Sequence, residues 1–185
     1  MYYLDQSGFA PTLPTGYTWT RIGERKAVPY EAPAGRRVNV VGALAPFAVD
    51  GPRLVYETRR RDQGKYDASA HLHFVREVVA GLRSDPSSGR TRPCIVVLDN
   101  YSVHHSNSVK NQIPMLEAVG IRFFYLPSYS PELNDIEPLW RQIKYQDLPE
   151  RSHKTAASLQ DAVESALAKR AKLLRGTENI LCRSA

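Results

Sequence analysis

Asp99 stands directly after an apolar run, Ile95–Leu98. Because the run is apolar at every position, it indicates a strand that is buried on both faces. Ligands in open α/β sheets bind beyond the carboxyl ends of the strands, so a carboxylate here is well placed for chemistry. An Asp that only caps the following turn is the competing interpretation. Asp5 also ends a short apolar run, Tyr2–Leu4, although alone it is better interpreted as an ordinary turn residue.

Glu137 is the third candidate, at the predicted start of a helix. A structural interpretation is available: Asn134 would be the N-cap, with Glu137 as its capping-box partner or paired with Arg141. Together with Asp5 and Asp99, however, Glu137 would complete a set of ligands suited to Mg²⁺ or Mn²⁺. Two such ions about 3.5–4 Å apart can activate an attacking oxygen and stabilise a leaving one. Without metal, the carboxylates would repel each other and their pKa values would rise.

The predicted elements form an α/β fold with a mixed sheet. Strands are predicted at 2–4, 17–20, 38–44, 54–58, 95–98 and 121–126, and helices at 67–82, 106–119, 134–147 and 155–174. Asp67 or Ser69 would cap the first helix, Pro114 would kink or restart the second, and Gly120 would end it. The strands at 38–44 and 54–58 are predicted to form an antiparallel hairpin, while helical crossovers fill the second half.

Composition places the chain among globular, non-membrane proteins. Its 185 residues are a normal size for one domain, and no apolar run approaches the roughly 20 residues that span a bilayer. Met1 is not followed by the basic and apolar regions of a secretory signal. Cys94 and Cys182 lack metal-ligand spacing and are predicted to be reduced thiols.

The excess of positive charge, +6 overall, is concentrated between positions 21 and 65, where ten basic residues stand against five acidic ones. Such a stretch is either a surface that faces a polyanion or a solvated basic face without a partner. The candidate DNA-binding residues are Arg21, Arg25, Lys26, Arg36, Arg37, Arg59, Arg60, Arg61 and, further along the chain, Lys144.

Two tryptophans have different predicted roles. Trp140 is spaced with Ile136 and Ile143 as the buried stripe of a helix, so we assign it to packing. Trp19 follows no such pattern, and it is interpreted as a core or partner-facing residue. The basic tail from 152 to 185 is predicted to contain an amphipathic helix that packs on the sheet, contacts DNA or supports dimerisation.

The segment Leu126–Trp140, followed by Lys144, carries a specific resemblance. It is similar to the last catalytic block of the Tc/mariner superfamily of DDE transposases and their bacterial insertion-sequence relatives, which runs Leu-Pro, Tyr-Ser-Pro, Leu-Asn-Pro-Ile-Glu, Trp, Lys. The segment Leu98–Asn100, with His104 downstream, resembles the second block, and Tyr3–Phe9 resembles the first. The resemblance extends from about residue 2 to residue 144.

The resemblance implies a ribonuclease-H-like fold, in which a five-stranded mixed sheet is flanked by helices. It implies that Asp5, Asp99 and Glu137 are catalytic and bind two Mg²⁺ or Mn²⁺ ions. The implied reaction is DNA cleavage at transposon ends and transfer of the freed strand into target DNA, usually at TA, by a homodimer in the bacterial cytosol. Residues expected beside the site are Asn100, His104 and Asn134, where His104 would contact DNA or orient the Asp99 loop. In contrast, His71, His73 and His105 are interpreted as ordinary surface or helix histidines.

The chain departs from the family pattern in two places. Asp135 replaces the usual proline of the last block, although Asp also suits a helix N-terminus. The helix-turn-helix region expected before the first block is missing, so recognition of transposon ends should be weak. We expect residues 1–150 to be the catalytic domain and residues 151–185 a helical extension packed on it or continuous with it. The alternatives are a catalytically inactive or domesticated DNA-binding module, and a ribonuclease acting on RNA–DNA hybrids.

Overall fold

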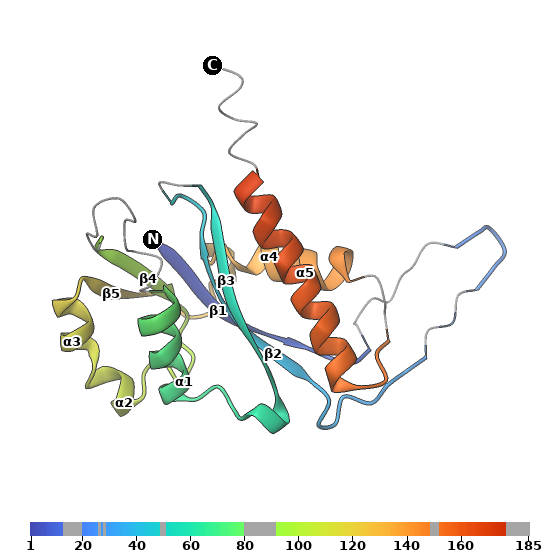
Figure 1. The fold of residues 1–185 in the computed structure, drawn as a ribbon, viewed down its shortest axis with the longest axis horizontal. Helices are drawn as coiled ribbons and strands as arrows, with labels where there is room; N and C mark the ends of the chain where they lie inside the picture. The colour runs from blue at the N-terminus through green and yellow to red at the C-terminus, as the bar shows by residue number, and fades with distance from the viewer. Residues whose placement is uncertain are drawn as a thin grey trace, which may run out of the picture.

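A computed structural model describes residues 1–12, 20–25, 27, 29–48, 51–79, 92–148 and 152–176. Its centre is a five-stranded sheet in the order β3-β2-β1-β4-β5 (Figure 1). The strands are β1 (Tyr2–Phe9), β2 (Val38–Ala45), β3 (Arg53–Arg60), β4 (Cys94–Leu98) and β5 (Ile121–Tyr125). Since β1, β2 and β3 are antiparallel neighbours whereas β4 and β5 run parallel to β1, the predicted five-stranded mixed sheet is confirmed.

The first strand is longer than its sequence indicates. Asp5 lies in the middle of β1, opposite Gly42, and pairing with β2 continues to Phe9 and Val38. The prediction that the strand covers only residues 2–4 and ends at Asp5 is therefore wrong. Gln6 to Gly8 have the composition of a turn, but the hydrogen bonds of β2 and the burial of Phe9 keep this segment extended.

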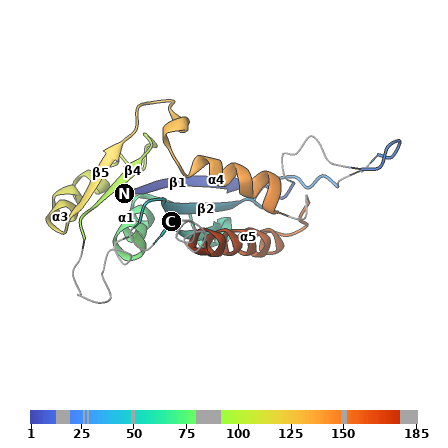
Figure 2. The ribbon, with the colours of Figure 1, turned by 90° about the horizontal axis from the view of Figure 1, so that it is seen from above.

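One face of the sheet packs against the last helices. These are α4 (Glu137–Gln142), the π-helical turn η4 (Ile143–Asp147) and α5 (Ala156–Gly176). Ile136, Trp140 and Ile143 are fully buried in one core cluster with residues of β2, which confirms the predicted stripe. Residues of α5, including Leu159 and Val163, belong to the same cluster. Figure 2 shows α4 running alongside β1, which brings the helix that carries Glu137 next to the strand that carries Asp5.

Gly42 allows this close approach. A Cβ at position 42 would lie 2.6 Å from Cη2 of Trp140, too near for any side chain. The indole therefore lies directly against the backbone of β2. Because β2 pairs with β1 at Asp5, the same packing also fixes the indole beside that carboxylate.

The opposite face is covered by α1 (Ala68–His73), the π-helical turn η2 (Phe74–Val79) and α3 (Ile113–Ala118). Leu4, Phe74, Val96 and Leu116 are fully buried in this second cluster. Asp67 caps α1, since its Oδ1 accepts a hydrogen bond of 2.9 Å from the Ala70 N–H, as predicted. The part of the predicted helix beyond residue 79 lies outside the described residues.

The predicted helix 106–119 is divided. It consists of α2 (Asn107–Lys110) and α3, with Pro114 in the first turn of α3, as expected of a residue that cannot continue a helix. Gly120 ends α3 with a φ of 81°. Two short 3-10 turns, η1 (Arg61–Gln63) and η3 (Pro131–Leu133), complete the described elements. The connection from β5 through η3 to α4 crosses the sheet beside the carboxyl end of β4 (Figure 2).

Several predictions concern residues that the structure does not describe. Trp19, Lys26, Cys182 and most of the expected strand 17–20 lie outside the described residues. Cys94 is buried at the start of β4. Among the helices of the described residues, none has the length and apolar character needed to cross a membrane.

Candidate active site

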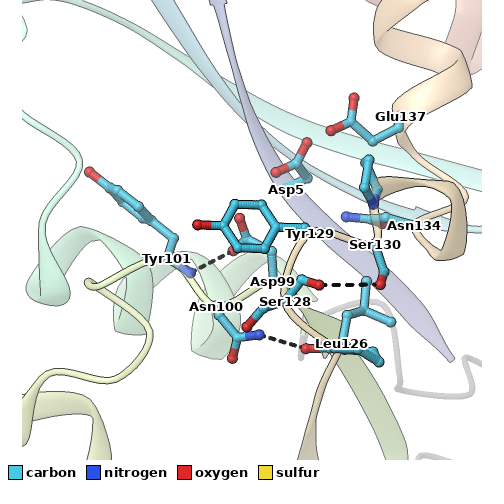
Figure 3. Close-up of a pocket in the computed structure, with 12 residues that line it drawn as sticks. Asp5, Asp99, Asn100, Tyr101, Leu126, Ser128, Tyr129, Ser130, Asn134 and Glu137 are labelled. Carbon is cyan, nitrogen blue, oxygen red and sulfur yellow. Dashed lines mark hydrogen bonds between the residues drawn. The ribbon is translucent and has the colours of Figure 1, made fainter.

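The three acidic residues predicted from the sequence line one open cleft of about 430 Å³. Asp5 projects from the middle of β1, Asp99 follows the last residue of β4, and Glu137 is the first residue of α4 (Figure 3). The remaining lining residues come from the loops after β4 and β5: Asn100, Tyr101, Leu126, Pro127, Ser128, Tyr129, Ser130, Pro131 and Asn134. The three side chains, distant in sequence, are thus brought to one place by two adjacent strands and a helix.

Asp5 is the buried member of the three, with only 8% of its surface exposed. The indole Nε1–H of Trp140 donates a hydrogen bond of 2.9 Å to its Oδ2. Burial raises the pKa of Asp5 to about 7; the negative charges of Glu137 and Asp99 add to the rise, while hydrogen bonds from the Gln6 backbone and from Trp140 oppose it. Near neutral pH this carboxyl group therefore holds a proton part of the time unless a cation is present.

Asp99 has the opposite environment. It is half-exposed, and its Oδ1 receives hydrogen bonds from His104 Nδ1 at 3.0 Å and from the Tyr101 N–H at 3.1 Å. The hydrogen bond from His104 is the main cause that holds the pKa of Asp99 below its ordinary value. His104 Nδ1 also lies 3.2 Å from the Asp99 carbonyl oxygen. Since both oxygens can only accept, Nδ1 carries the proton and donates.

His104 is itself held by a buried aromatic group. Its ring is 1% exposed and lies 4.6 Å from the ring of His71, which is also buried. Tyr66 Oη is 3.0 Å from His71 Nδ1. Burial, followed by the influence of His104, lowers the pKa of His71 to about 3, so His71 is neutral. Of the two roles considered for His104, this geometry favours orienting the Asp99 loop, because a buried ring offers no surface to DNA.

Of the three histidines interpreted as ordinary, His73 and His105 are less buried than His71. His71 is a helix residue, as expected, but it is a core residue rather than a surface one. His73 is exposed, with Nε2 at 3.9 Å from Glu57 Oε1. His105 stacks on Tyr125 with ring centroids 4.4 Å apart.

Asn100 ties the two loops that form the walls of the cleft. Its Nδ2 donates a hydrogen bond of 2.6 Å to the carbonyl oxygen of Leu126, which follows β5. Its Oδ1 lies 3.0 Å from His105 Nε2. The loop after β4, which carries Asp99, is thereby fixed to the loop after β5. Asn100 lies beside the site, as predicted, and its contacts within the chain are structural.

The start of α4 differs from the prediction. The N-cap is Ile136, no side chain caps the helix, and the Glu137 N–H bonds to the Asn134 carbonyl oxygen at 2.9 Å. Asn134 is therefore not the N-cap, and the capping-box interpretation is wrong. The reason is that Asn134 ends the preceding turn η3 with an extended backbone. Its side chain is 3% exposed at the cleft, and its Oδ1 has no hydrogen-bond partner.

Among the candidate DNA-binding residues that the structure describes, Lys144 lies close to two of the carboxylates, Glu137 and Asp5. Its Nζ lies 5.3 Å from the centre of the Phe9 ring. Burial lowers the pKa of Lys144, whereas the negative charges of Glu137 and Asp5 oppose this shift. Arg37 is close enough to contribute a further lowering. A cationic group is thus held at the side of the cleft where β1 meets α4.

The other basic candidates that the structure describes do not line the cleft. Three of them form ion pairs within the chain: Arg36 with Glu31 at 2.8 Å, Arg59 with Glu57 at 3.3 Å and Arg60 with Asp62 at 3.1 Å. Others are exposed, namely Arg21, Arg25, Arg37 and Arg61. The segment that carries Arg21 and Arg25 projects beyond the end of the sheet (Figure 1). Their predicted contact with DNA stays a prediction.

Trp140 has a polar role that the sequence analysis missed, because helical spacing explained it fully as a packing residue. A buried indole N–H usually needs an acceptor, and this general requirement was the available signal. The helix that presents Glu137 thus also hydrogen-bonds Asp5. Tyr101 and Tyr129, whose side chains line the cleft, were likewise not singled out.

The donors of the cleft suit a hard divalent cation. They are three carboxylates and the unpaired amide oxygen of Asn134, with no sulfur ligand and with the Nδ1 of nearby His104 already engaged. Burial is the main cause of the raised pKa of Asp5, and the negative charges of Glu137 and Asp99 add to it, so a bound cation would favour the ionised carboxylate. Among the described residues, however, no three Asp, Glu, His or Cys side chains are arranged to hold a metal as they stand. Mg²⁺ commonly uses only one or two carboxylates, completing its shell with water and phosphate.

Comparison with known proteins agrees with this arrangement. No curated protein matches the chain. Among solved structures, it resembles a Mos1 mariner paired-end complex with Mn (TM-score 0.67, 15% identity, covering 94% of this chain and 49% of that one). It also resembles the catalytic domain of Mos1 mariner transposase (TM-score 0.59, 14% identity, covering 90% and 69%).

This likeness shows the ribonuclease-H-like fold that the sequence resemblance implied. The chain spans about half the length of the Mos1 transposase chains in the complexes. Its residues 1–160 match the family model of the DDE superfamily endonucleases. Because the match includes Asp5, Asp99 and Glu137 and covers most of the sequence, the chain belongs to the DDE superfamily of endonucleases.

Proposed function

We propose that this chain is the catalytic domain of a DDE transposase, which cuts DNA at transposon ends and transfers the freed 3′ strand into target DNA. The observation that carries the proposal is the shared cleft of Asp5, Asp99 and Glu137. The proposed cofactors are two Mg²⁺ or Mn²⁺ ions held by these three side chains. Family membership supports the proposal, and so do the Mos1 complexes, whose names include a paired-end complex with a left transposon end and a strand transfer complex.

The chain's own residues prepare the cleft for a phosphodiester. Asp99 is ionised at neutral pH, and His104 and the Tyr101 N–H further stabilise its negative charge, which lowers its pKa. Asp5 must lose its proton, and the Trp140 N–H then orients the resulting carboxylate. Glu137 supplies the third carboxylate from α4. When bound, divalent ions activate the attacking oxygen and stabilise the leaving one.

Further parts of the proposal extend beyond the cleft. We propose DNA as the partner, with TA-containing targets, a homodimer as the active complex and the bacterial cytosol as the location. Residues 1–150 would form the catalytic unit and 151–185 an extension, which is supported by the packing of Leu159 and Val163 with Trp140 in one core. Asn100 and His104 would position the Asp99 loop, while Asn134 would accept a hydrogen bond at the site.

The proposal is tested by nicking of a supercoiled plasmid in the presence of Mn²⁺. We expect the Asp99→Asn variant to lose activity by a factor on the order of 10²–10³, because a ligand that neutralises charge in the transition state is removed. Glu117→Gln, which changes an exposed carboxylate on α3, is the matched control and should keep full activity. Robust nicking by Asp99→Asn would exclude the assigned role of Asp99.

Two further measurements separate the proposal from other functions. Calorimetry should detect Mn²⁺ binding; no binding at millimolar metal, with DNA binding intact, would instead indicate a non-catalytic module derived from this family. Cleavage of duplex DNA should exceed cleavage of an RNA–DNA hybrid of the same sequence. The reverse preference would indicate a ribonuclease of the same fold.

A further inference from the structure

Tyr129 has an unusual backbone for its residue type. Its φ is 58°, and it is the one non-glycine residue with positive φ among the described residues. Such a conformation is unfavourable for an L-residue with a side chain, and it persists where the surrounding structure enforces it. Tyr129 lies between Pro127 and Pro131 in the loop that connects β5 to α4. Strain of this kind is often found at ligand-binding sites.

The side chain of Tyr129 is completely exposed, at 100% of its reference surface. The ring therefore contributes no burial that could offset the unfavourable backbone. Nevertheless it lines the same cleft as Asp5, Asp99 and Glu137 (Figure 3). An apolar ring is thus presented to solvent at the place where a substrate strand would enter.

A second aromatic ring stands in the same cleft. Tyr101 is 46% exposed. Two contacts fix it: its N–H donates a hydrogen bond to Asp99, and its ring meets the His104 ring edge to face with centroids 5.8 Å apart. Tyr101 is thus held by contacts with Asp99 and His104, whereas Tyr129 extends from the loop between β5 and α4. In Figure 3 the Tyr129 ring overlaps Asp99, whereas the Tyr101 ring points away from Asp5 and Glu137.

The chemistry of a DNA strand suggests what these rings bind. A phosphodiester at the carboxylates has a nucleobase attached on each side, within a few ångströms of the cleft. Every base has a flat π-face, and stacking on tyrosine is tolerant of sequence. In the interior of a duplex these faces are covered by neighbouring base pairs, so a protein ring stacks there on a base that has been unstacked from its neighbours.

We propose that Tyr129 stacks on one nucleobase unstacked from the DNA next to the phosphodiester at Asp5, Asp99 and Glu137, with Tyr101 as the second aromatic wall of that base pocket. This inference rests on the proposed function, because it takes the ligand of the cleft to be DNA. It goes further in assigning a base-binding role to the strained loop.

Binding of two 12-nucleotide strands tests the stacking directly. One is oligothymidine, and the other has the same backbone without any bases. Both carry fluorescein, and affinities are measured by anisotropy in EDTA. We expect Tyr129→Ala to weaken oligothymidine binding roughly 5- to 150-fold, the range that corresponds to loss of one stacked base, and to leave binding of the abasic strand unchanged. Tyr129→Phe, which keeps the ring, should stay within about twofold of wild type.

Two controls exclude trivial explanations. Tyr129→Gly removes the ring and also relieves the positive φ, so it should melt at or above the wild-type temperature while losing the same affinity as the Ala variant. Tyr30→Ala removes an exposed tyrosine that does not line the cleft and should bind both strands as wild type does.

Three results would overturn the inference. Equal losses on both strands would mean that Tyr129 contacts the backbone, and a loss in Tyr129→Phe as large as in Tyr129→Ala would assign the contact to the hydroxyl group. No loss in Tyr129→Ala, including the case in which wild type binds the two strands equally, would exclude stacking. The proposed function fails separately: absence of Mn²⁺-dependent nicking by wild type would reject it even if base-dependent binding by Tyr129 were found.

Discussion

Two carboxylates of one cleft are held in opposite ways. Asp5 is buried in the middle of β1, its pKa is raised to about 7 mainly by burial, and the Trp140 N–H donates a hydrogen bond to its carboxylate. Asp99 is half-exposed at the end of β4, and its pKa is lowered mainly by the hydrogen bond from His104. The two residues are the same in type, and their environments alone make the difference.

The difference teaches how such a site can be both stable and ready to bind a cation. Asp99 is a preformed anion that can attract a metal at any pH near neutrality. Asp5 is costly to ionise alone, because burial and the neighbouring charges of Glu137 and Asp99 disfavour its charged form. Its ionisation is therefore coupled to the arrival of positive charge. The core that packs Trp140 against Gly42 maintains this costly position.

The largest expected effect is on the free energy of unfolding, and it tests the buried carboxylate, Asp5. The folded-state pKa of Asp5, about 7, lies above its reference value of 3.8. The proton bound in the folded state thus stabilises it fully below about pH 3.8, and this contribution is lost as pH rises through 7. Without metal, Asp5 alone should lower the free energy of unfolding by roughly 4 kcal/mol between acid and pH 8. Asp5→Asn should remove most of this pH dependence.

Denaturant unfolding at several pH values between 4 and 8, in EDTA, measures the effect. Asp62→Asn is the control, since Asp62 is exposed and its pKa is lowered by its hydrogen bond with Arg60, which gives a contribution of opposite sign. Added Mn²⁺ at pH 8 should stabilise wild type far more than Asp5→Asn. If wild type and Asp5→Asn show parallel pH profiles, Asp5 does not titrate near pH 7. The proposed difference between the pKa values of Asp5 and Asp99 would then be wrong.

The next largest effect concerns Asp99, the half-exposed carboxylate. His104→Gln removes the imidazole N–H that holds Asp99, so the pKa of Asp99 should move back toward its ordinary value and the carboxylate should lose its fixed orientation. Partners of a metal ligand typically contribute 10- to 100-fold in metal affinity, and we expect a loss of about this size in Mn²⁺ binding. Nicking should fall at low Mn²⁺ and recover in large part at high Mn²⁺.

His105→Gln is the matched control for this experiment. His105 is the neighbouring histidine, but it contacts Asn100 and Tyr125 rather than Asp99. Calorimetry with Mn²⁺ should therefore show a clearly smaller change than for His104→Gln. Equal changes in the two variants would indicate a general effect on the loop, and the specific role of His104 in positioning Asp99 would be lost.

Local sequence patterns predicted the parts of the fold whose burial follows from neighbouring residues. The apolar run Ile95–Leu98 identified β4 and placed Asp99 at its end, and helical spacing placed Trp140 in the core. The mixed sheet followed from the order of the elements, and its five strands were implied by the family resemblance. In β4 and in the helix of Trp140, the pattern of buried apolar side chains repeats over a few neighbouring residues, so it is visible in the sequence.

The missed features depend on residues that are distant in sequence. The extension of β1 beyond Asp5 depends on pairing with β2, about 30 positions away. The contact of His71 with His104, and the hydrogen bond from Trp140 to Asp5, likewise join separate segments. Tyr129 has a left-handed backbone although its type disfavours it, so no local preference could predict it.

The smallest expected effect asks whether the cleft carries its own cation for DNA. Lys144 is held beside the Phe9 ring and close to Glu137 and Asp5, on the buried half of the site. If Lys144 contacts a phosphate, Lys144→Met should weaken DNA binding by a few fold and reduce the slope of log affinity against log salt by about 1. The control is Lys110→Met, an exposed lysine on α2 outside the cleft.

Titration of a labelled duplex at several salt concentrations, in EDTA, distinguishes the two variants. A reduced slope in Lys144→Met alone would assign one phosphate contact to the same side of the cleft as Asp5. The Asp5 side would then bind the DNA backbone, while Asp99 would help to bind the metal. Equal slopes for both variants would mean that Lys144 balances the charge of Glu137 and Asp5 within the chain. The two halves would then differ only in how they hold carboxylates, and contact with the DNA backbone would have to come from exposed residues such as Arg37.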